Sequence, residues 1–184
     1  MHARLMICWL LLSPLCIEAQ TEKKKTGLLP HHAKLQYAGS IGFLSIGVGY
    51  EFAKKKLQAD VYYGYVPESI GGVNIHSVTG KLTWLPLSIE RNKYTYSLLT
   101  AGFLVNYAFG KQYDFSLEDF DYYGFPTAAH IGLFVGGGIT RNRLGLYYEL
   151  GSTDRDLVSF VNNTKGIRFD EIIHFGIGAR LNLK

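Results

Sequence analysis

The chain has 184 residues, of which 47% are hydrophobic and 18% are charged, and its formal net charge is +4. This length predicts a single domain, and after Ala19 no apolar run approaches the roughly 20 residues of a membrane-spanning helix, which excludes a helical membrane protein. Because the basic residues are not gathered into one patch, we expect no nucleic-acid partner.

The first 19 residues have the pattern of a secretory signal peptide. Arg4 gives the start of the chain a positive charge, Leu5–Leu12 is a short apolar core, and Ala19 completes a cleavage site of small residues. The apolar core is too short for a transmembrane helix. We therefore expect residues 1–19 to be a signal peptide that is removed on export.

Removal of the signal peptide would leave two regions. Residues 20–32 are predicted to be a periplasmic N-terminal linker, and residues 33–184 an outer-membrane β-barrel. Both cysteines, Cys8 and Cys16, lie in the signal peptide. The mature chain would therefore have no thiol for a disulfide, a nucleophile or a metal site.

After the linker, apolar residues alternate with small or polar ones in segment after segment, which is the period of a β-strand. Most segments have about the length that a tilted strand needs to cross a bilayer, roughly 9–11 residues. In chain order, strands are predicted over residues 33–38, 40–52, 57–65, 76–85, 94–109, 128–140, 144–151 and 173–183. A change of face near Leu98 predicts a β-bulge in the fifth strand.

The connections between these strands alternate between short and long. The short ones are basic turns over residues 53–56, 86–93 and 141–143. The long ones are loops over residues 67–74, 110–127 and 152–170, and a very tight turn at Gly39 and Ser40 joins the first two strands. Short turns at one end and long loops at the other are typical of outer-membrane barrels. The sequence thus predicts an all-β fold, an antiparallel up-and-down transmembrane β-barrel of eight strands.

Each predicted strand has one apolar face and one face of polar residues and glycine. An eight-stranded barrel is only wide enough inside to be filled by side chains, so the polar, glycine-rich faces are expected to line the lumen. The predicted polar network of the lumen comprises Glu51, Asp60, Lys81, Glu149, His174 and Arg180. Because an unpaired buried charge is costly, we expect these groups to neutralise one another.

Aromatic residues gather near the ends of the predicted strands. The predicted interfacial aromatics are Tyr50, Phe52, Trp84 and Tyr94 near the short turns, and Tyr63, Tyr65, Tyr107 and Phe109 near the long loops. Tyrosine and tryptophan favour the membrane–water interface, so these two groups are expected to form girdles around the barrel.

The order of strands, basic turns and long loops resembles the small eight-stranded bacterial outer-membrane barrels, including the OmpA/OmpX-like and lipid A deacylase families. The resemblance spans nearly the whole mature chain and rests on this pattern, without a diagnostic motif. It implies a location in the bacterial outer membrane. It also implies outer-membrane lipid, lipopolysaccharide and the barrel-assembly machinery as partners, and no cofactor.

The deacylase family carries a His-x-Ser pair near the outer end of its seventh strand, where the histidine activates the serine. The corresponding stretch here, residues 148–154, contains Ser152 but no histidine two residues before it. His130 and His174 are expected to point into the lumen. We therefore predict no catalytic residue.

Two other sequence features resemble binding sites. His31 and His32 are adjacent imidazoles, but neighbouring residues on a strand point apart, so a solvated linker is expected and no metal site. Gly136–Gly138 lacks the lysine of a phosphate-binding loop and lies within a predicted strand.

Three functions fit these patterns. The favoured one is a small outer-membrane barrel with a filled polar lumen and a non-enzymatic role, either structural or in surface interactions through its external loops, whose extracellular ligand the sequence does not identify. The first alternative is a lipid A-modifying hydrolase in the outer membrane. The second is a secreted soluble ligand-binding β-barrel, which would need apolar residues inside rather than outside.

Overall fold

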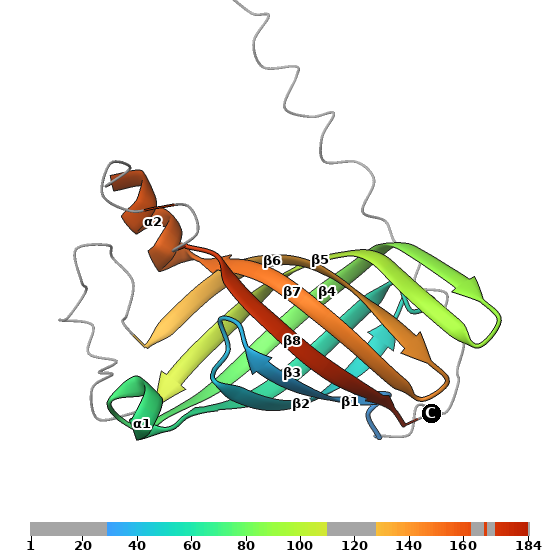
Figure 1. Cartoon of the computed structure of the whole chain (residues 1–184), viewed down its shortest axis with the longest axis horizontal. Helices are drawn as coiled ribbons and strands as arrows, with labels where there is room; N and C mark the ends of the chain where they lie inside the picture. The colour runs from blue at the N-terminus through green and yellow to red at the C-terminus, as the bar shows by residue number, and fades with distance from the viewer. Residues whose placement is uncertain (1–28, 110–127, 163–167, 169–171, 184) are drawn as a thin grey trace, which may run out of the picture.

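Alternation of apolar and polar residues gives every strand two unlike faces, and the sheet closes on itself into a barrel (Figure 1). The structure is a computed structural model that describes residues 29–109, 128–162, 168 and 172–183. Its strands are β1 (His32–Ala38), β2 (Leu44–Phe52), β3 (Leu57–Val66), β4 (Ile75–Arg91), β5 (Tyr94–Phe109), β6 (Ala129–Arg141), β7 (Leu144–Thr153) and β8 (His174–Asn182).

Each strand pairs in antiparallel fashion with the next, and β1 pairs with β8 to close the barrel. Closure leaves no sheet edge unpaired over the length of the shared ladder. The prediction of an all-β, eight-stranded, antiparallel up-and-down barrel is therefore confirmed. The predicted signal peptide and the loop over residues 110–127 lie outside the described residues.

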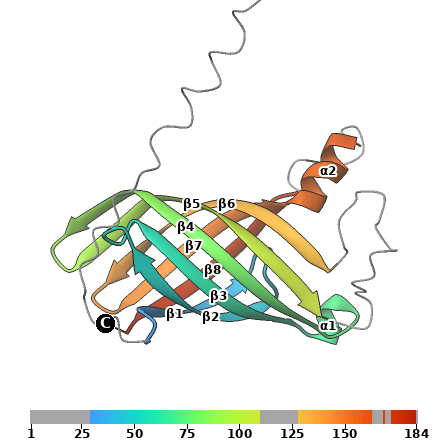
Figure 2. The ribbon, with the colours of Figure 1, turned by 180° about the vertical axis from the view of Figure 1, so that it is seen from behind.

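The two ends of the barrel differ (Figures 1 and 2). Three short turns and the chain ends of β1 and β8 lie at one end. The helices α1 (Glu68–Gly71) and α2 (Asp154–Asn162) lie at the other end, in the connections that the sequence predicts as long loops. In the described ranges, no helix is long and apolar enough to cross a membrane.

The β4–β5 hairpin is longer than predicted. β4 runs to Arg91 and turns at Asn92 and Lys93, so the predicted turn over residues 86–93 is wrong. The pairing of β3 with β4 stops at Leu57 and Trp84. Pro86 therefore has no paired residue on β3 to which a backbone N–H would have to donate. The register shifts after Trp84 on β4, and it shifts again after Ser97 on β5, which confirms the predicted bulge.

The connection between β1 and β2 is not the tight turn that was expected. Residues 39–43 fold back into the barrel, and Ile41 is 1% exposed inside it. Positive φ angles at Gly39 (80°) and Gly42 (138°) allow this path, because glycine tolerates such angles. Ser77 Oγ donates to the Ile41 carbonyl at 2.9 Å, so the buried backbone of the loop finds a partner in the lumen.

Glycines make room for aromatic rings inside the barrel. A Cβ atom at Gly47 would lie 2.5 Å from Tyr62 Cδ1, and one at Gly178 would lie 2.3 Å from Tyr147 Cζ. Both distances are too short for two carbon atoms in contact. The rings of Tyr62 and Tyr147 therefore fill the lumen only because the paired residue on the neighbouring strand is glycine.

Substitution Gly47→Ala tests this complementarity. The added methyl group meets the Tyr62 ring, so we expect a loss of about 1–3 kcal/mol in the free energy of unfolding, as for overpacked cores. Equilibrium unfolding in urea after refolding into lipid vesicles measures it. The matched control is Gly80→Ala on β4, because Gly80 faces outward with nothing within 4 Å of an added Cβ. Equal losses in the two variants would contradict this account.

Candidate functional site

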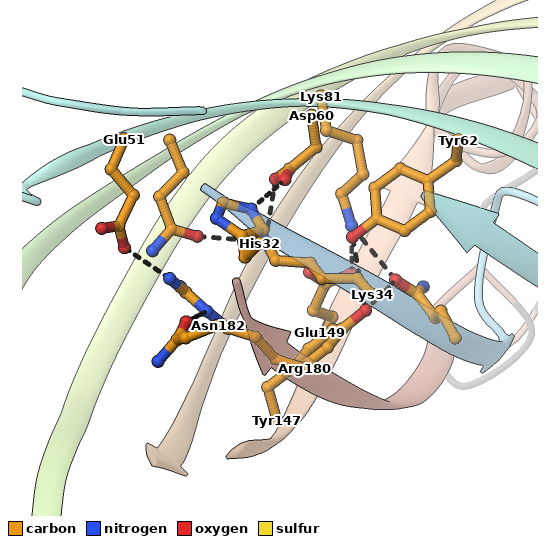
Figure 3. A network of polar contacts seen from close by, with 12 residues as sticks. His32, Lys34, Glu51, Asp60, Tyr62, Lys81, Tyr147, Glu149, Arg180 and Asn182 are labelled. Atoms are coloured by element: carbon orange, nitrogen blue, oxygen red, sulfur yellow. Dashed lines mark hydrogen bonds and ion pairs between the residues drawn. The ribbon is translucent and has the colours of Figure 1, made fainter. Parts of the chain in front are cut away.

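The first polar cluster in the lumen joins β1 to β3 (Figure 3). His32 Nε2 and Asp60 Oδ1 lie 2.5 Å apart, and Lys34 Nζ donates to Asp60 Oδ2 at 2.8 Å and to Gln58 Oε1 at 3.0 Å. His32 is 0% exposed and Asp60 is 3% exposed. Asp60 thus has two partners from β1, which compensates for the cost of burying its charge.

The second cluster joins β4 to β7. Lys81 Nζ forms an ion pair with Glu149 Oε2 and donates to Gln36 Oε1 at 3.3 Å. The same ammonium lies 4.4 Å from the Phe134 ring centre, a cation–π contact. The Tyr147 hydroxyl also donates to Gln36 Oε1, at 3.2 Å, which links β1 to β7.

The third cluster borders the short-turn end. Arg180 Nη2 donates to Glu51 Oε1, and Arg180 Nε donates to Asn182 Oδ1 at 2.7 Å. These groups line a polar cavity of about 440 Å³ that also contacts Lys54 and Lys55. This cavity, which we call the vestibule, hydrates one end of the lumen while the middle stays filled by side chains.

The opposite end of the lumen is closed by apolar contacts. Ile41, Tyr62, Leu104 and Phe134 form a buried cluster under the β1–β2 loop. Asn106 Nδ2 donates to the Ser40 carbonyl at 3.2 Å, which holds the loop in place. The β1–β2 loop and this cluster therefore cover the lumen at this end, among the described residues.

Five of the six residues predicted for the lumen network lie in these clusters: Glu51, Asp60, Lys81, Glu149 and Arg180. The sixth, His174, does not, because its Nε2 lies 2.7 Å from Asp156 Oδ2 of α2. The prediction of a solvated linker at His31 and His32 is also wrong. His32 belongs to β1 and is buried, and His31 Nδ1 accepts a hydrogen bond from the Glu51 backbone at 2.9 Å.

Other members of the network were missed at the sequence level. These are the residues of the polar face of β1 and the lumen tyrosines, namely His32, Lys34, Gln36, Tyr62 and Tyr147. The signal was present in β1, where His32, Lys34 and Gln36 alternate with Ala33, Leu35 and Tyr37. The short length of this segment concealed its polar face.

Outside, the barrel presents a continuous apolar belt. Ile46 is 61% exposed, and Leu133 and Leu146 are each 62% exposed. The predicted interfacial aromatics all lie on this outer face, and all but Trp84 lie near strand ends. Trp84 lies within β4, opposite Leu57 at the start of β3. Those near the short turns are Tyr50, Phe52, Trp84 and Tyr94, and those near the long loops are Tyr63, Tyr65, Tyr107 and Phe109.

A cluster of chemically active groups lies at the rim of the barrel, where β7 passes into α2. Thr153 caps the helix, since Asp156 N donates to Thr153 Oγ1 at 3.4 Å and Thr153 N donates to Asp156 Oδ2 at 3.1 Å. Thr153 Oγ1 also donates to Asp156 Oδ2, which His174 approaches from β8. Burial alone would raise the pKa of Asp156, but the hydrogen bonds from Thr153 and His174 hold it below its usual value.

This rim cluster does not have the geometry of a hydrolase. The carboxylate lies between the hydroxyl and the imidazole, whereas nucleophile activation needs the imidazole next to the hydroxyl. Among the described residues, the buried Ser152 hydroxyl has no hydrogen-bond partner, and His130 Nδ1 faces Asp154 at 3.8 Å instead. The described ranges contain no group of three or more histidine, cysteine or acidic side chains placed to hold a metal ion.

These features define the class of protein as a closed up-and-down β-barrel of eight antiparallel strands with a polar, side-chain-filled lumen. No protein-family model matches the sequence, and no curated protein matches it. The chain is similar to a solved structure described as the outer membrane enzyme PagL. The TM-score is 0.42 at 10% identity, over 83% of this chain and 98% of PagL. A similarity of this degree carries no argument about activity.

Substitution Glu149→Gln tests the ion pair between Lys81 and Glu149. Lys81 is then left as a buried charge without its counter-ion, so we expect a loss of about 3–5 kcal/mol in the free energy of unfolding. The matched control is Glu51→Gln, the same change in the pair that borders the vestibule. Water can replace the lost partner of Arg180, so a loss of about 1 kcal/mol is expected there. A similar loss in both variants would contradict the difference in hydration.

Substitution Asp156→Ala tests the attachment of α2. We expect faster backbone hydrogen exchange over residues 153–162 and unchanged exchange in β2 to β5, because Asp156 is hydrogen-bonded to Thr153 at the end of β7 and to His174 at the start of β8. The pKa of Asp156 is lower in the folded state than the usual pKa of an aspartate, so the ionised carboxylate stabilises the attachment of α2 at every pH above that usual pKa. This stabilisation is lost as the pH falls through the lowered pKa of Asp156. Unchanged exchange in the variant would show that other contacts hold the helix.

Proposed function

We propose that this protein is a small bacterial outer-membrane β-barrel with a filled polar lumen and a non-enzymatic role. That role is structural, or lies in surface interactions through the external loops. The proposal rests on a distribution of side chains opposite to that of a soluble protein. The charged residues Asp60, Lys81 and Glu149 lie inside the barrel, and large apolar residues cover its outside.

The apolar exterior favours lipid over water as the surroundings of the barrel. Exposed apolar residues occur on all eight strands, including Leu35 on β1 (47%), Phe103 on β5 (46%) and Ile177 on β8 (48%). A soluble monomer rarely exposes a contiguous apolar patch of more than a few hundred Å². A secreted ligand-binding barrel also needs an apolar cavity, but the cavity at the short-turn end is lined by Glu51, Lys54 and Arg180.

The distribution of turns supports an orientation. The short turns would lie in the periplasm, with the described chain ends, and the connections with α1 and α2 would lie outside the cell. Outer-membrane lipid and lipopolysaccharide would surround the belt, and the barrel-assembly machinery would insert the chain.

A non-enzymatic role is supported by the rim cluster. A lipid A-modifying hydrolase needs a nucleophile with a neighbouring base at the outer rim. Thr153 and Ser152 are the hydroxyls there, and neither has an imidazole beside it among the described residues. The rim cluster is better suited to holding α2 against the barrel.

Fluorescence of Trp84 tests membrane insertion. Residues 20–184 contain a single tryptophan, Trp84, which is 55% exposed on the outer face. We expect phospholipids with brominated acyl chains to quench its emission strongly once the barrel has refolded in vesicles. The unfolded chain in urea is the control, in which a water-soluble quencher is effective and the brominated lipid is not. Quenching of the refolded chain by the soluble quencher alone would indicate a soluble barrel.

Incubation with lipid A tests the enzymatic alternative. We expect the mass spectrum of lipid A to stay unchanged after incubation with the refolded barrel, because no activated nucleophile lies at the described rim. Loss of one acyl chain that is abolished by Ser152→Ala or Thr153→Ala would establish a hydrolase instead.

A further inference from the structure

We infer that the outer face of the barrel carries a binding site for one anionic phospholipid, at the short-turn end across β5 to β8. This inference rests on the proposed function, since it needs the belt to face lipid. Two separate observations support it. One is an apolar hollow in the belt, and the other is a group of cations at the end of the same strands.

The hollow, which we call the notch, is a depression of about 350 Å³ in the outer surface. It exists because Gly137 occupies an outward position on β6, between Val135 and Ile139, where the belt otherwise carries a large side chain. The bulge of β5 lies beside it, opposite Gly136 and Gly138. The side chains around the notch are almost all apolar or aromatic: Leu98, Ile139, Leu146, Tyr148 and Ile177.

The ring of Tyr148 bounds the notch and partly covers its floor. A Cβ atom at Gly137 would lie 3.3 Å from both Tyr148 Cε1 and Tyr148 Oη, so any larger residue there would have to displace the ring. The hollow is therefore a consequence of this glycine. Its apolar lining has the chemistry against which an acyl chain packs.

The cations lie immediately beyond the notch. Arg141 is two residues after Ile139 on the outward side of β6, which places it roughly 7 Å further toward the short-turn end at the rise of a β-strand. Arg143 and Lys93 occupy the two neighbouring turns, and all three side chains are exposed. Within the described part of the chain, none of the three forms an ion pair.

The position of the Arg141 guanidinium fits a phosphate. Its carbon lies 5.4 Å from the centre of the Tyr94 ring, so the group is held on the outer face at the level of the aromatic girdle. Stacking on an aromatic face leaves the N–H edges of a guanidinium available for a phosphate oxygen. Glu90, an acid of the adjacent β4–β5 hairpin, lines the vestibule. An acyl chain in the notch and a phosphate at Arg141 would belong to one phospholipid. The positive charges of Arg141, Arg143 and Lys93 favour a phospholipid with an anionic headgroup.

Tryptophan quenching measures lipid selectivity at this position. In a Trp84→Phe background, Leu146→Trp places the reporter at the notch and Leu133→Trp places it on the belt away from the notch, with equal native exposure of 62%. Brominated phosphatidylglycerol is compared with brominated phosphatidylcholine of the same chain length. We expect preferential quenching by phosphatidylglycerol at position 146, of roughly fivefold in relative binding for each cation engaged, and little preference at position 133.

Charge variants show whether the cations are responsible. Arg141→Gln with Arg143→Gln should reduce the preference at position 146 severalfold. The matched control is Lys54→Gln with Lys55→Gln, which removes the same charge from the β2–β3 turn at the same end. Equal preference at positions 146 and 133, or an equal effect of the two charge variants, would overturn the site and leave the membrane barrel intact. Absence of quenching by either lipid at both positions would overturn the membrane barrel and the site together.

Discussion

The structure depends on one constraint, the narrow interior of an eight-stranded barrel. Such a lumen has room for side chains and little else, so every polar group inside must find its partner there. The three ion-paired clusters differ in their surroundings. Asp60 is enclosed by its partners from β1, Lys81 is buried against Glu149, and Arg180 borders the vestibule. The charges thus connect strands that are not neighbours in the sheet, and the Lys81–Glu149 pair joins β4 to β7 across the lumen.

The same constraint explains the distribution of glycine. The rings of Tyr62 and Tyr147 find room in the lumen because their paired neighbours on the adjacent strands are Gly47 and Gly178, so large and small residues are matched between neighbouring strands. On the outer face the relation is different. Gly137 has no large side chain to complement it except Tyr148, and the space left over becomes the notch. Glycine therefore makes room for aromatic rings inside the barrel and leaves a hollow on its outer face.

The two ends of the barrel are built for different surroundings. At the short-turn end the lumen opens into a hydrated vestibule, and basic turns surround the opening. At the other end, the inward-folded loop with Ile41 closes the lumen and the Thr153–Asp156–His174 cluster attaches α2 to the rim. The described residues thus leave the lumen hydrophilic at the short-turn end and cover it with apolar side chains at the other.

Periodicity alone determined the barrel, the number of strands and the face to which most side chains point, because a two-residue repeat is a local property of the chain. It also sufficed to place Glu51, Asp60, Lys81, Glu149 and Arg180 inside. Only the tertiary structure decided which charges pair. Lys34 meets Asp60, and Lys81 meets Glu149, across separations of 26 and 68 residues. The tertiary structure also decides that His174 contacts Asp156 at the rim, because Asp156 comes near only when α2 folds back. His32 is buried because β1 pairs with β8 and closes the barrel. Such contacts depend on closure and register, which no local pattern contains.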